Sequence, residues 1–338
     1  MMNLGRRAFL GGMAALPFAA RGLDAAQPAG AQGDQRIEEQ AETGTQSAYV
    51  PPSAPIIDCH IHLFDKTRPH GAPYPTDLQP GLTMLPPRYR ATVNGTGIVG
   101  VIVTECSSLP EDTLWVLDLC KSDTLFVGHC GYLDFGTPNF VKFFDRFRSN
   151  RMFLGVRYRN VAGRSFERGL DRPIFVADIK TMTDAGLVME YGGHPSVILK
   201  LADKLPPAAK IVIPHYPRLN IRADQLESYM TPLKELGTRP NVVIKLSGVT
   251  KIVDGRVVGD LSLLRGWLDQ LWDLFGEDRV VYGTDYPHED RTAPFLNVLN
   301  TAVSYVKEKS PAAQEKVFWR NSARIYRWQK RAPNQPSV

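Results

Sequence analysis

Three histidines and one aspartate stand at the ends of short apolar runs, and these residue types can bind a metal ion or activate water. His60 and His62 are two positions apart, so on a β-strand both side chains point to the same side, with Asp58 below them. His215 and Asp285 end two later apolar runs. Imidazole nitrogens and carboxylate oxygens are zinc ligands, and a carboxylate can also take a proton from water. We predict that His60, His62, His215 and Asp285 form one catalytic site.

These residues can meet only if the apolar runs share one structure. Eight runs rich in Val and Ile follow residue 54, at residues 55–62, 98–105, 125–133, 153–159, 187–191, 211–215, 242–247 and 280–285. Their spacing of about 32 residues fits one strand plus one helix per unit. Runs that are almost entirely apolar indicate strands buried on both faces, as in a parallel sheet. Helices are expected between them, over residues 111–122, 138–148, 195–205, 222–236, 258–275 and 293–308.

Eight such units predict an α/β fold, a single-domain (β/α)8 TIM barrel over residues 55–330. The rival is a doubly wound open sheet, but no Gly-x-Gly-x-x-Gly follows the first run, which removes the commonest ligand signal of that fold. In a (β/α)8 barrel the chemistry lies at the carboxyl ends of the strands. The three histidines and the aspartate are therefore expected at one mouth of the barrel.

Basic side chains near the same strand ends indicate an anionic substrate. Arg157 and Arg159 alternate on the fourth run, so both face one side, and an arginine pair binds a carboxylate or phosphate well. Arg218 and Lys251 follow the sixth and seventh runs and are further candidate substrate contacts. The alternative is that the two arginines of the fourth run pair with an acid of the protein, and Glu190 is one acid that could pair with an arginine.

The joint pattern resembles the amidohydrolase-2 (amidohydrolase-related) family over about residues 55–328. The resemblance rests on residues 58–62, 213–215, 242–248, 282–288 and the closing segment 321–326. Residues 155–157 and 245–248 make the branch of sugar lactonases and 2-pyrone-4,6-dicarboxylate lactonase the nearest. The resemblance implies a (β/α)8 barrel, with His60, His62, His215 and Asp285 as the site.

The same resemblance leaves the cofactor open. A divalent ion, zinc first, is implied at the four residues, whereas 2-pyrone-dicarboxylate lactonase-like members keep these residues and work without metal. Arg157 and Arg159 stand where the wider superfamily often has a bridging lysine or glutamate, so a two-metal centre is not expected. The decarboxylases of the family place a histidine directly at the end of strand five; here His194 comes later and is only a further candidate ligand.

We expect a carboxylic-ester hydrolase that opens a lactone or similar ester of an acidic or sugar-derived small molecule. Asp285 would take the proton from water, and the three histidines, with or without metal, would stabilise the oxyanion. Tyr286 and His288 are expected to shape the rim of the site. One alternative is a metal-dependent decarboxylase of an aromatic or unsaturated carboxylic acid. Another is a non-catalytic small-molecule-binding barrel, which would have no need of the four residues.

The chain's ends and composition bound its location and partners. Residues 1–31 combine Arg6 and Arg7 with an apolar run of about 13 residues, shorter than the roughly 20 needed to span a bilayer. This pattern resembles a bacterial twin-arginine export signal, cleaved after Ala26 or Ala31, and predicts a periplasmic or exported protein. Residues 32–54 are expected to be a flexible linker and 331–338 a C-terminal tail.

Composition excludes a disordered chain, because 43% of the 338 residues are apolar. Cleavage after residue 31 lowers the net charge from +5 to +3, since three arginines and one aspartate leave. No nucleic-acid or membrane partner is therefore expected, and homo-oligomerisation stays open. The four cysteines show no metal-site spacing, and we expect them to be buried free thiols.

Overall fold

The computed structural model of the chain describes residues 49–68, 83–160, 164–215, 223–249, 251–253, 256–258, 261–288 and 294–337. For residues 251–253 and 256–258 it describes the backbone alone. The predicted export signal and the linker up to residue 48 lie outside the described residues. Arg218 lies outside them as well, and so does the side chain of Lys251.

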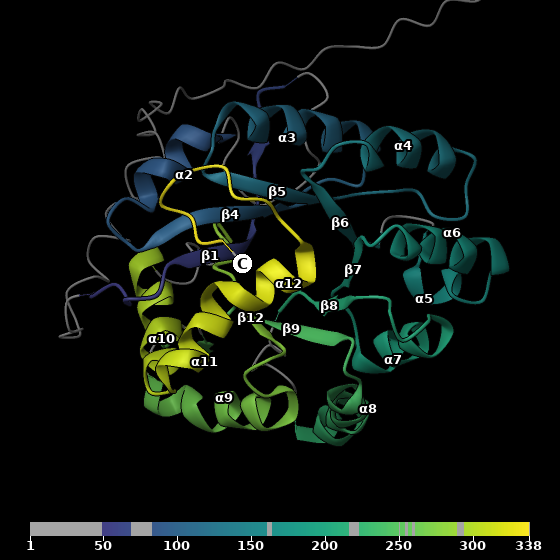
Figure 1. The fold of residues 1–338 in the computed structure, drawn as a ribbon. Helices are drawn as coiled ribbons and strands as arrows, with labels where there is room; N and C mark the ends of the chain where they lie inside the picture. Colours follow the sequence, from purple (N-terminus) through teal and green to yellow (C-terminus); the bar gives the residue numbers. More distant parts are fainter. Residues whose placement is uncertain are drawn as a thin grey trace, which may run out of the picture. The chain divides into compact units, whose positions relative to one another are not determined.

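Eight parallel strands form the barrel, which confirms the predicted (β/α)8 fold (Figure 1). In spatial order they are β1 (Ile56–Ile61), β4 (Ile98–Thr104), β5 (Phe126–Gly131), β6 (Phe153–Tyr158), β7 (Val188–Tyr191), β8 (Ile211–Ile213), β9 (Val242–Leu246) and β12 (Val280–Tyr282). Each coincides with one of the eight apolar runs. The segment after β12 closes the ring, because the Asp285 amide donates to His60 O at 2.8 Å and the His62 amide to Tyr286 O at 2.9 Å.

Helices alternate with the strands, and most of them cover the outside of the barrel, while α12 lies across one end of it (Figure 1). They are α2 (Pro86–Thr92), α3 (Pro110–Ser122), α4 (Asn139–Arg148), α5 (Phe166–Gly169), α6 (Pro173–Asp184), α7 (Pro195–Lys204), α8 (Leu226–Thr238), α9 (Leu261–Phe275), α10 (Phe295–Lys307), α11 (Pro311–Glu315) and α12 (Asn321–Tyr326). Short pieces complete the chain: β2 (Phe64–Asp65) with β3 (Thr83–Met84), β10 (Lys251–Val253) with β11 (Arg256–Val258), η1 (Ala223–Gln225) and η3 (Lys316–Arg320). None of the described helices has the length and hydropathy needed to span a bilayer.

The six predicted helices are all present. The short helices α2, α5 and α11 were not predicted, and neither was the twelve-residue helix α6. Its sequence is rich in β-branched residues, which lowers intrinsic helix propensity. Packing outweighs that propensity here, because Phe175, Ile179 and Met182 of α6 are buried against the barrel. Pro173 opens the helix, where its fixed φ and missing N–H cost nothing.

The inside of the barrel is filled by apolar side chains at its amino end and closed by the C-terminal segment. Residues early in the strands, such as Ile57, Val127 and Val243, form one buried cluster with Trp319, Ala323, Ile325, Tyr326 and Trp328. A second, larger cluster lies between the sheet and the helices. Helix α12 therefore plugs the amino end, and the carboxyl ends of the strands are left for a site.

Both flanks of the barrel make defined contacts with it. Tyr49, in the segment expected to be linker, donates its hydroxyl to Thr96 O at 2.7 Å. Past α12, Arg331 and Gln335 hydrogen-bond to main-chain carbonyls around the start of β5. The four cysteines are buried and free, as predicted.

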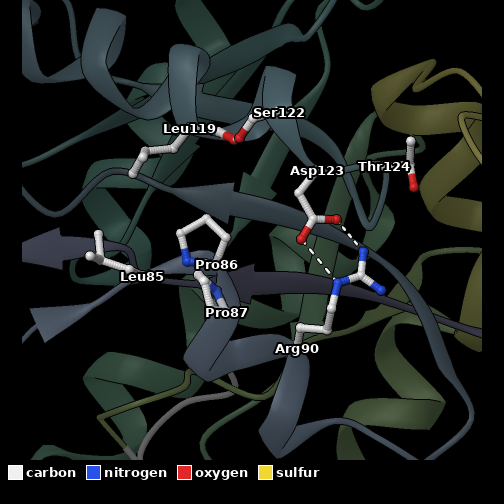
Figure 2. A pocket seen from close by; sticks show the side chains of 8 residues that line it. All are labelled: Leu85, Pro86, Pro87, Arg90, Leu119, Ser122, Asp123 and Thr124. Atoms are coloured by element: carbon white, nitrogen blue, oxygen red, sulfur yellow. Dashed lines mark hydrogen bonds and ion pairs between the residues drawn. The ribbon is translucent and has the colours of Figure 1, made fainter.

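A surface pocket of about 490 Å³ lies between α2 and the end of α3 (Figure 2). Its lining includes Leu85, Leu119 and the ion pair between Arg90 and Asp123. The chain enters β5 at this point, so the pocket is at the amino end of the barrel. It shares no residue with the predicted site.

Candidate active site

The predicted histidine pair is placed by an irregularity in β1. Between Asp58 and Ile61 three residue steps of β1 stand opposite two steps of β4, a bulge-like shift in register. The alternation is broken there, so Cys59 joins the interior cluster while His60 and His62 both reach the mouth. The expectation that Asp58 lies below the histidines on the same face is wrong. Its carboxylate instead accepts hydrogen bonds from Tyr89 OH at 2.7 Å and Thr284 Oγ1 at 2.6 Å.

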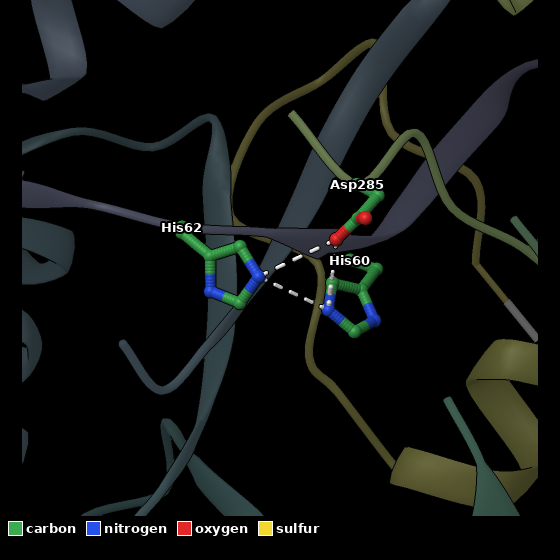
Figure 3. A group of neighbouring side chains, drawn as sticks. All are labelled: His60, His62 and Asp285. Carbon is green, nitrogen blue, oxygen red and sulfur yellow. Dashed lines mark hydrogen bonds and ion pairs between the residues drawn. The ribbon is translucent and has the colours of Figure 1, made fainter. Parts of the chain in front are cut away.

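His60, His62 and Asp285 meet at the carboxyl ends of β1 and β12 (Figure 3). The two Nε2 atoms are 3.3 Å apart, and each lies 3.4 Å from Asp285 Oδ1. All three side chains are at least 97% buried. The three donor atoms thus form a nearly equilateral triangle that joins residues from opposite ends of the barrel sequence.

The triangle fits a divalent ion. Bonds of about 2.0–2.1 Å at the tetrahedral angle place zinc ligands about 3.4 Å from one another, which matches all three sides. Asp285 Oδ1 is buried and accepts no hydrogen bond from any described residue. A buried carboxylate oxygen without a donor calls for a cation or a water molecule. Three protein ligands also leave a fourth position for water, as in catalytic zinc sites.

Electrostatics keep the histidine pair in the neutral form that can bind a metal. Burial, followed by the positive charge of Lys245, lowers the pKa of His60 well below its usual value. Burial and the charges of Arg157 and Arg159 lower the pKa of His62 in the same way. Both rings are therefore neutral at pH 7, when imidazole presents a lone pair to a metal or to a hydrogen-bond donor.

His215 stands at the edge of the triangle, as predicted. It follows β8, and its Nε2 lies 3.8 Å from Asp285 Oδ1. Its Nδ1 is 3.0 Å from Ser247 Oγ, which orients the ring. Its side chain is 17% exposed, against 0% for His60, so it is the one of the three histidines that solvent or a substrate can reach.

The segment after β12 holds the aspartate in place. Asp285 has φ of +61°, a left-handed conformation that non-glycine residues rarely adopt and that clusters at functional sites. His288 contacts His62 edge to face at 5.4 Å between ring centroids, and burial lowers its pKa to about 3. His288 therefore borders the site, as expected. Tyr286 does not form a rim, because it is 4% exposed and packs on Tyr89 and Phe295.

Arg157 and Arg159 converge on an acid that sequence reasoning missed. Glu105, just past β4, has Oε1 2.6 Å from Arg157 Nη1 and 3.5 Å from Arg159 Nε. The ion pair that stood as the alternative to substrate binding is therefore present. The Glu105 main-chain oxygen also lies 2.9 Å from His62 Nδ1, so this residue ties the arginines to the histidine pair. Glu105 ends the second apolar run, the same signal that marked the other site residues.

A buried lysine lies directly under the histidine pair. Lys245 extends from β9 into the barrel, and its Nζ is 2.9 Å from Glu190 and 3.4 Å from His60 Nδ1. The suggestion that Glu190 pairs with an arginine is wrong, because its partners are Lys245 and Tyr326. The sequence did carry a signal for this position. Lys245 is an isolated lysine in the apolar run of β9, and it lies two positions after the inward-facing Val243, so the two side chains share one face of the strand.

Three further residues were predicted to belong to the site. One of them lies away from it in the structure, and the other two cannot be placed. His194 is exposed, begins α7 as its N-cap, and its Nδ1 lies 2.8 Å from Ser196 Oγ. It is not part of the group at the mouth, so its candidacy as a metal ligand is not supported. Arg218 and the Lys251 side chain lie outside the described residues.

The chain belongs to the amidohydrolase family, whose model matches residues 57–328, and it is an enzyme of the amidohydrolase superfamily. Its relatives include an L-fucono-1,5-lactonase of Burkholderia ambifaria, 23% identical over 80% of this chain and 95% of the relative. A zinc-bound amidohydrolase of Burkholderia multivorans shares the fold, with 20% identity, a TM-score of 0.70, and coverage of 82% of this chain and all of that one.

Two further solved structures share the fold at lower similarity. A putative 2-pyrone-4,6-dicarboxylic acid hydrolase of Pseudomonas putida matches with 16% identity and a TM-score of 0.63, over 81% of this chain and 98% of that one. The 5-carboxyvanillate decarboxylase of Novosphingobium aromaticivorans, crystallised with manganese, matches with 14% identity and a TM-score of 0.56, over 84% of this chain and all of that one. Such distant likeness establishes the barrel and does not choose a reaction.

Proposed function

We propose that this protein is a hydrolase that opens a lactone, or a similar ester, of an acidic or sugar-derived small molecule. The observation that carries the proposal is the buried triangle of His60, His62 and Asp285 beside the more accessible His215. Such a group can activate a water molecule and stabilise an oxyanion on the same small volume. The L-fucono-1,5-lactonase relatives support a lactone as the ester.

In the proposed mechanism, the Asp285 carboxylate accepts a proton from the water that attacks the lactone carbonyl. When no ion is bound, Asp285 Oδ1 is available for this because it accepts no hydrogen bond from the described residues. His215, held through Nδ1 by Ser247, faces the developing oxyanion from the exposed side of the site. The proton on Asp285 then passes to the leaving alkoxide as the ring opens.

We further propose that His60, His62 and Asp285 hold a divalent ion, zinc first, because the edges of their triangle match zinc geometry. When bound, such an ion lowers the pKa of water and polarises the carbonyl. Without it, the same residues orient water and ester by hydrogen bonds alone.

The charge around the site favours an anionic substrate. Glu105 offsets one of the two arginines, so Arg157, Arg159 and Glu105 together carry one net positive charge beside the histidines. Arg159 makes the longer contact, at 3.5 Å, and is 23% exposed against 14% for Arg157, so it is the better placed to meet a substrate carboxylate.

Decarboxylation is the less favoured reaction. Strand β7 ends in Glu190 and Tyr191, and Glu190 is engaged by Lys245 beneath the site. The histidine that family decarboxylases place at this strand end is replaced by His194, which is exposed at the start of α7. No described residue at β7 therefore adds a further imidazole to the group.

The proposal is tested by a screen of sugar lactones and acidic lactones. In each reaction, the acid that hydrolysis releases is titrated at constant pH. The expected result is one proton released per lactone consumed, with acidic lactones preferred. The same reactions are followed for carbon dioxide with aromatic carboxylic acids. Carbon dioxide release in the absence of lactone hydrolysis would contradict the proposal. Elemental analysis of the purified protein reports whether it holds a divalent ion.

A further inference from the structure

The ion pair at the ends of β4 and β6 has two buried atoms without partners. Glu105 Oε1 meets Arg157 Nη1 at 2.6 Å, but Glu105 Oε2 accepts no hydrogen bond from any described residue. Arg157 Nε is buried as well and donates to none of them. The two atoms belong to the carboxylate and the guanidinium that form the ion pair, so covalent geometry keeps them close together. The pair therefore offers one acceptor and one donor that the described residues leave unused.

This ion pair lies beside the catalytic triangle. Strand β5 separates β4 from β6 in the sheet, so the contact between their ends reaches across one strand. Burial disfavours the charge of Arg157, but the nearby charges of Glu105 and Asp285 outweigh burial and raise its pKa. The main-chain oxygen of Glu105 is also 2.9 Å from His62 Nδ1. The unused acceptor and donor are thus at the mouth, next to the residues that are proposed to act on the lactone.

The chemistry of the two atoms defines the partner that they lack. A carboxylate oxygen only accepts a hydrogen bond, and an arginine N–H only donates one. A hydroxyl group does both, so a single hydroxyl can bind Glu105 Oε2 and Arg157 Nε at once. A cation is a poor partner, because Arg157 and Arg159 already outnumber the one carboxylate. The arrangement therefore fits a neutral hydroxyl group.

We propose that Glu105 is a specificity-determining residue whose Oε2 accepts a hydrogen bond from a hydroxyl group of the substrate. The inference rests on the proposed function and narrows its substrate class to hydroxylated, sugar-derived lactones. A ring that lacks this hydroxyl would bury the carboxylate oxygen without a partner, and buried groups left unpaired are a strong basis for rejection. Arg159, which is partly exposed, stays available for a carboxylate on the same molecule.

The alternative is a purely structural role for Glu105. In that case a water molecule occupies the unused acceptor and donor permanently, and the carboxylate serves only to neutralise the arginines. The two roles differ in a measurable way. A structural role affects all ligands of the site equally, whereas a hydroxyl contact distinguishes a hydroxylated ligand from its deoxy analogue.

The first test measures binding to the wild-type protein and needs no variant. Neutral sugar 1,5-lactams of several ring configurations are compared by calorimetry with analogues that each lack one ring hydroxyl. A lactam resists hydrolysis, so its affinity is measured without turnover. We expect the loss of one particular hydroxyl to weaken binding about tenfold or more, as for a hydrogen bond to a charged group. Equal affinity across the series, or no binding of any lactam, would overturn the proposal.

The second test repeats the measurement with Glu105→Gln. Glutamine keeps an oxygen that accepts from Arg157 and replaces Oε2 with an amide group that donates. We expect the variant to bind the deoxy lactam within about twofold of the wild type and to lose most of its preference for the hydroxylated lactam. Neutral lactams are used because the change in charge at residue 105 acts little on them.

The matched control is Asp123→Asn, which makes the same change in a carboxylate that is paired with Arg90 at the amino end of the barrel. It should keep the full preference for the hydroxylated lactam. In Glu105→Gln, an equal loss of affinity for both lactams would show a structural role and contradict the proposal, as would an unchanged preference.

Failure of this inference and failure of the proposed function give different results. A protein that opens lactones with and without ring hydroxyls at similar kcat/KM keeps the proposed function and loses the inference. A protein that opens no lactone, yet prefers the hydroxylated lactam through Glu105, loses the proposed function and keeps the hydroxyl site.

Discussion

The two ends of the barrel differ in how many of their polar groups have hydrogen-bond partners. At the amino end, the C-terminal segment supplies hydrogen bonds to the polar groups of the barrel. Arg331 donates to the main-chain oxygens of Cys120, Lys121, Asp123 and Phe126. Trp328 donates its indole N–H to Ser322 Oγ at 3.0 Å, and Gln335 binds Val99 O and Thr124 O.

At the carboxyl end, buried polar atoms lack hydrogen-bond partners. Asp285 Oδ1 and Glu105 Oε2 accept no hydrogen bond from any described residue, and Asp285 is held with a positive φ. Polar atoms that are buried and unsatisfied cost stability, and they persist where a ligand or a reaction uses them. The comparison separates an end built for stability from an end built for chemistry.

Asp285→Asn should have the largest effect and should act on activity alone. Loss of the proposed general base should lower kcat by about 10³-fold or more. Stability should not fall, because Oδ1 accepts no hydrogen bond that the amide would break and a neutral amide replaces a buried carboxylate. Lactone turnover and chemical unfolding are measured on the same preparation. Near-native turnover would show that Asp285 is not the base.

Lowering the pH should reduce the free energy of unfolding through His129, a buried residue of the barrel strand β5. Burial lowers the pKa of His129, in β5, to about 4, so the unfolded chain gains a proton near pH 6.5 that the folded chain refuses. Stability is therefore fully present above pH 6.5 and falls as the pH drops toward 4. This one histidine should account for about 3 kcal/mol of that fall. Unfolding of the wild type and His129→Gln across this range should show a shallower pH slope in the variant, and equal slopes would contradict the assignment.

Arg331→Ala should have the reverse profile of Asp285→Asn. It strips the guanidinium from four main-chain carbonyls and should cost about 2–3 kcal/mol of stability. The site is at the other end of the barrel, so kcat on folded protein should stay within about twofold of the wild type. Chemical unfolding of the variant and the wild type measures the loss of stability, and initial rates measure kcat. A large loss of kcat without loss of stability would break the division between the ends.

Arg159→Ala should have the smallest effect, and it tests whether the mouth of the barrel recognises a negatively charged substrate. Removing a partly exposed charge should raise KM about tenfold for an acidic lactone and leave KM for a neutral sugar lactone unchanged. Arg324→Ala, which removes an exposed arginine bonded to Asp278 O, serves as the control. An equal change for both lactones would indicate that Arg159 acts on the shape of the site and does not recognise charge.

The sequence was sufficient for the barrel because the period of its apolar runs reports strands directly. Each run from 55–62 to 280–285 became a strand, and residues at their ends met as expected. Helix α6 was missed because its stability comes from packing and not from the intrinsic propensity of its β-branched residues.

The site was predictable in its members and less so in its contacts. His60, His62, His215 and Asp285 could be found because strand ends of one barrel converge. The outward turn of Asp58 depends on a register shift in β1, which has no residue signature. The pairing of Glu105 with the arginines, and of Glu190 with Lys245, joins residues 52 and 55 positions apart, and such partners are set by the tertiary fold.

The most direct test of the central claim, that this mouth activates water against a lactone carbonyl, is a reaction in ¹⁸O-labelled water. The hydroxy acid formed by the wild-type protein is analysed by mass spectrometry after a single turnover, beside Asp285→Asn. We predict one ¹⁸O atom in the carboxylate of the wild-type product and no product above background from the variant. Label in the alcohol oxygen, or equal product from both proteins, would contradict the account.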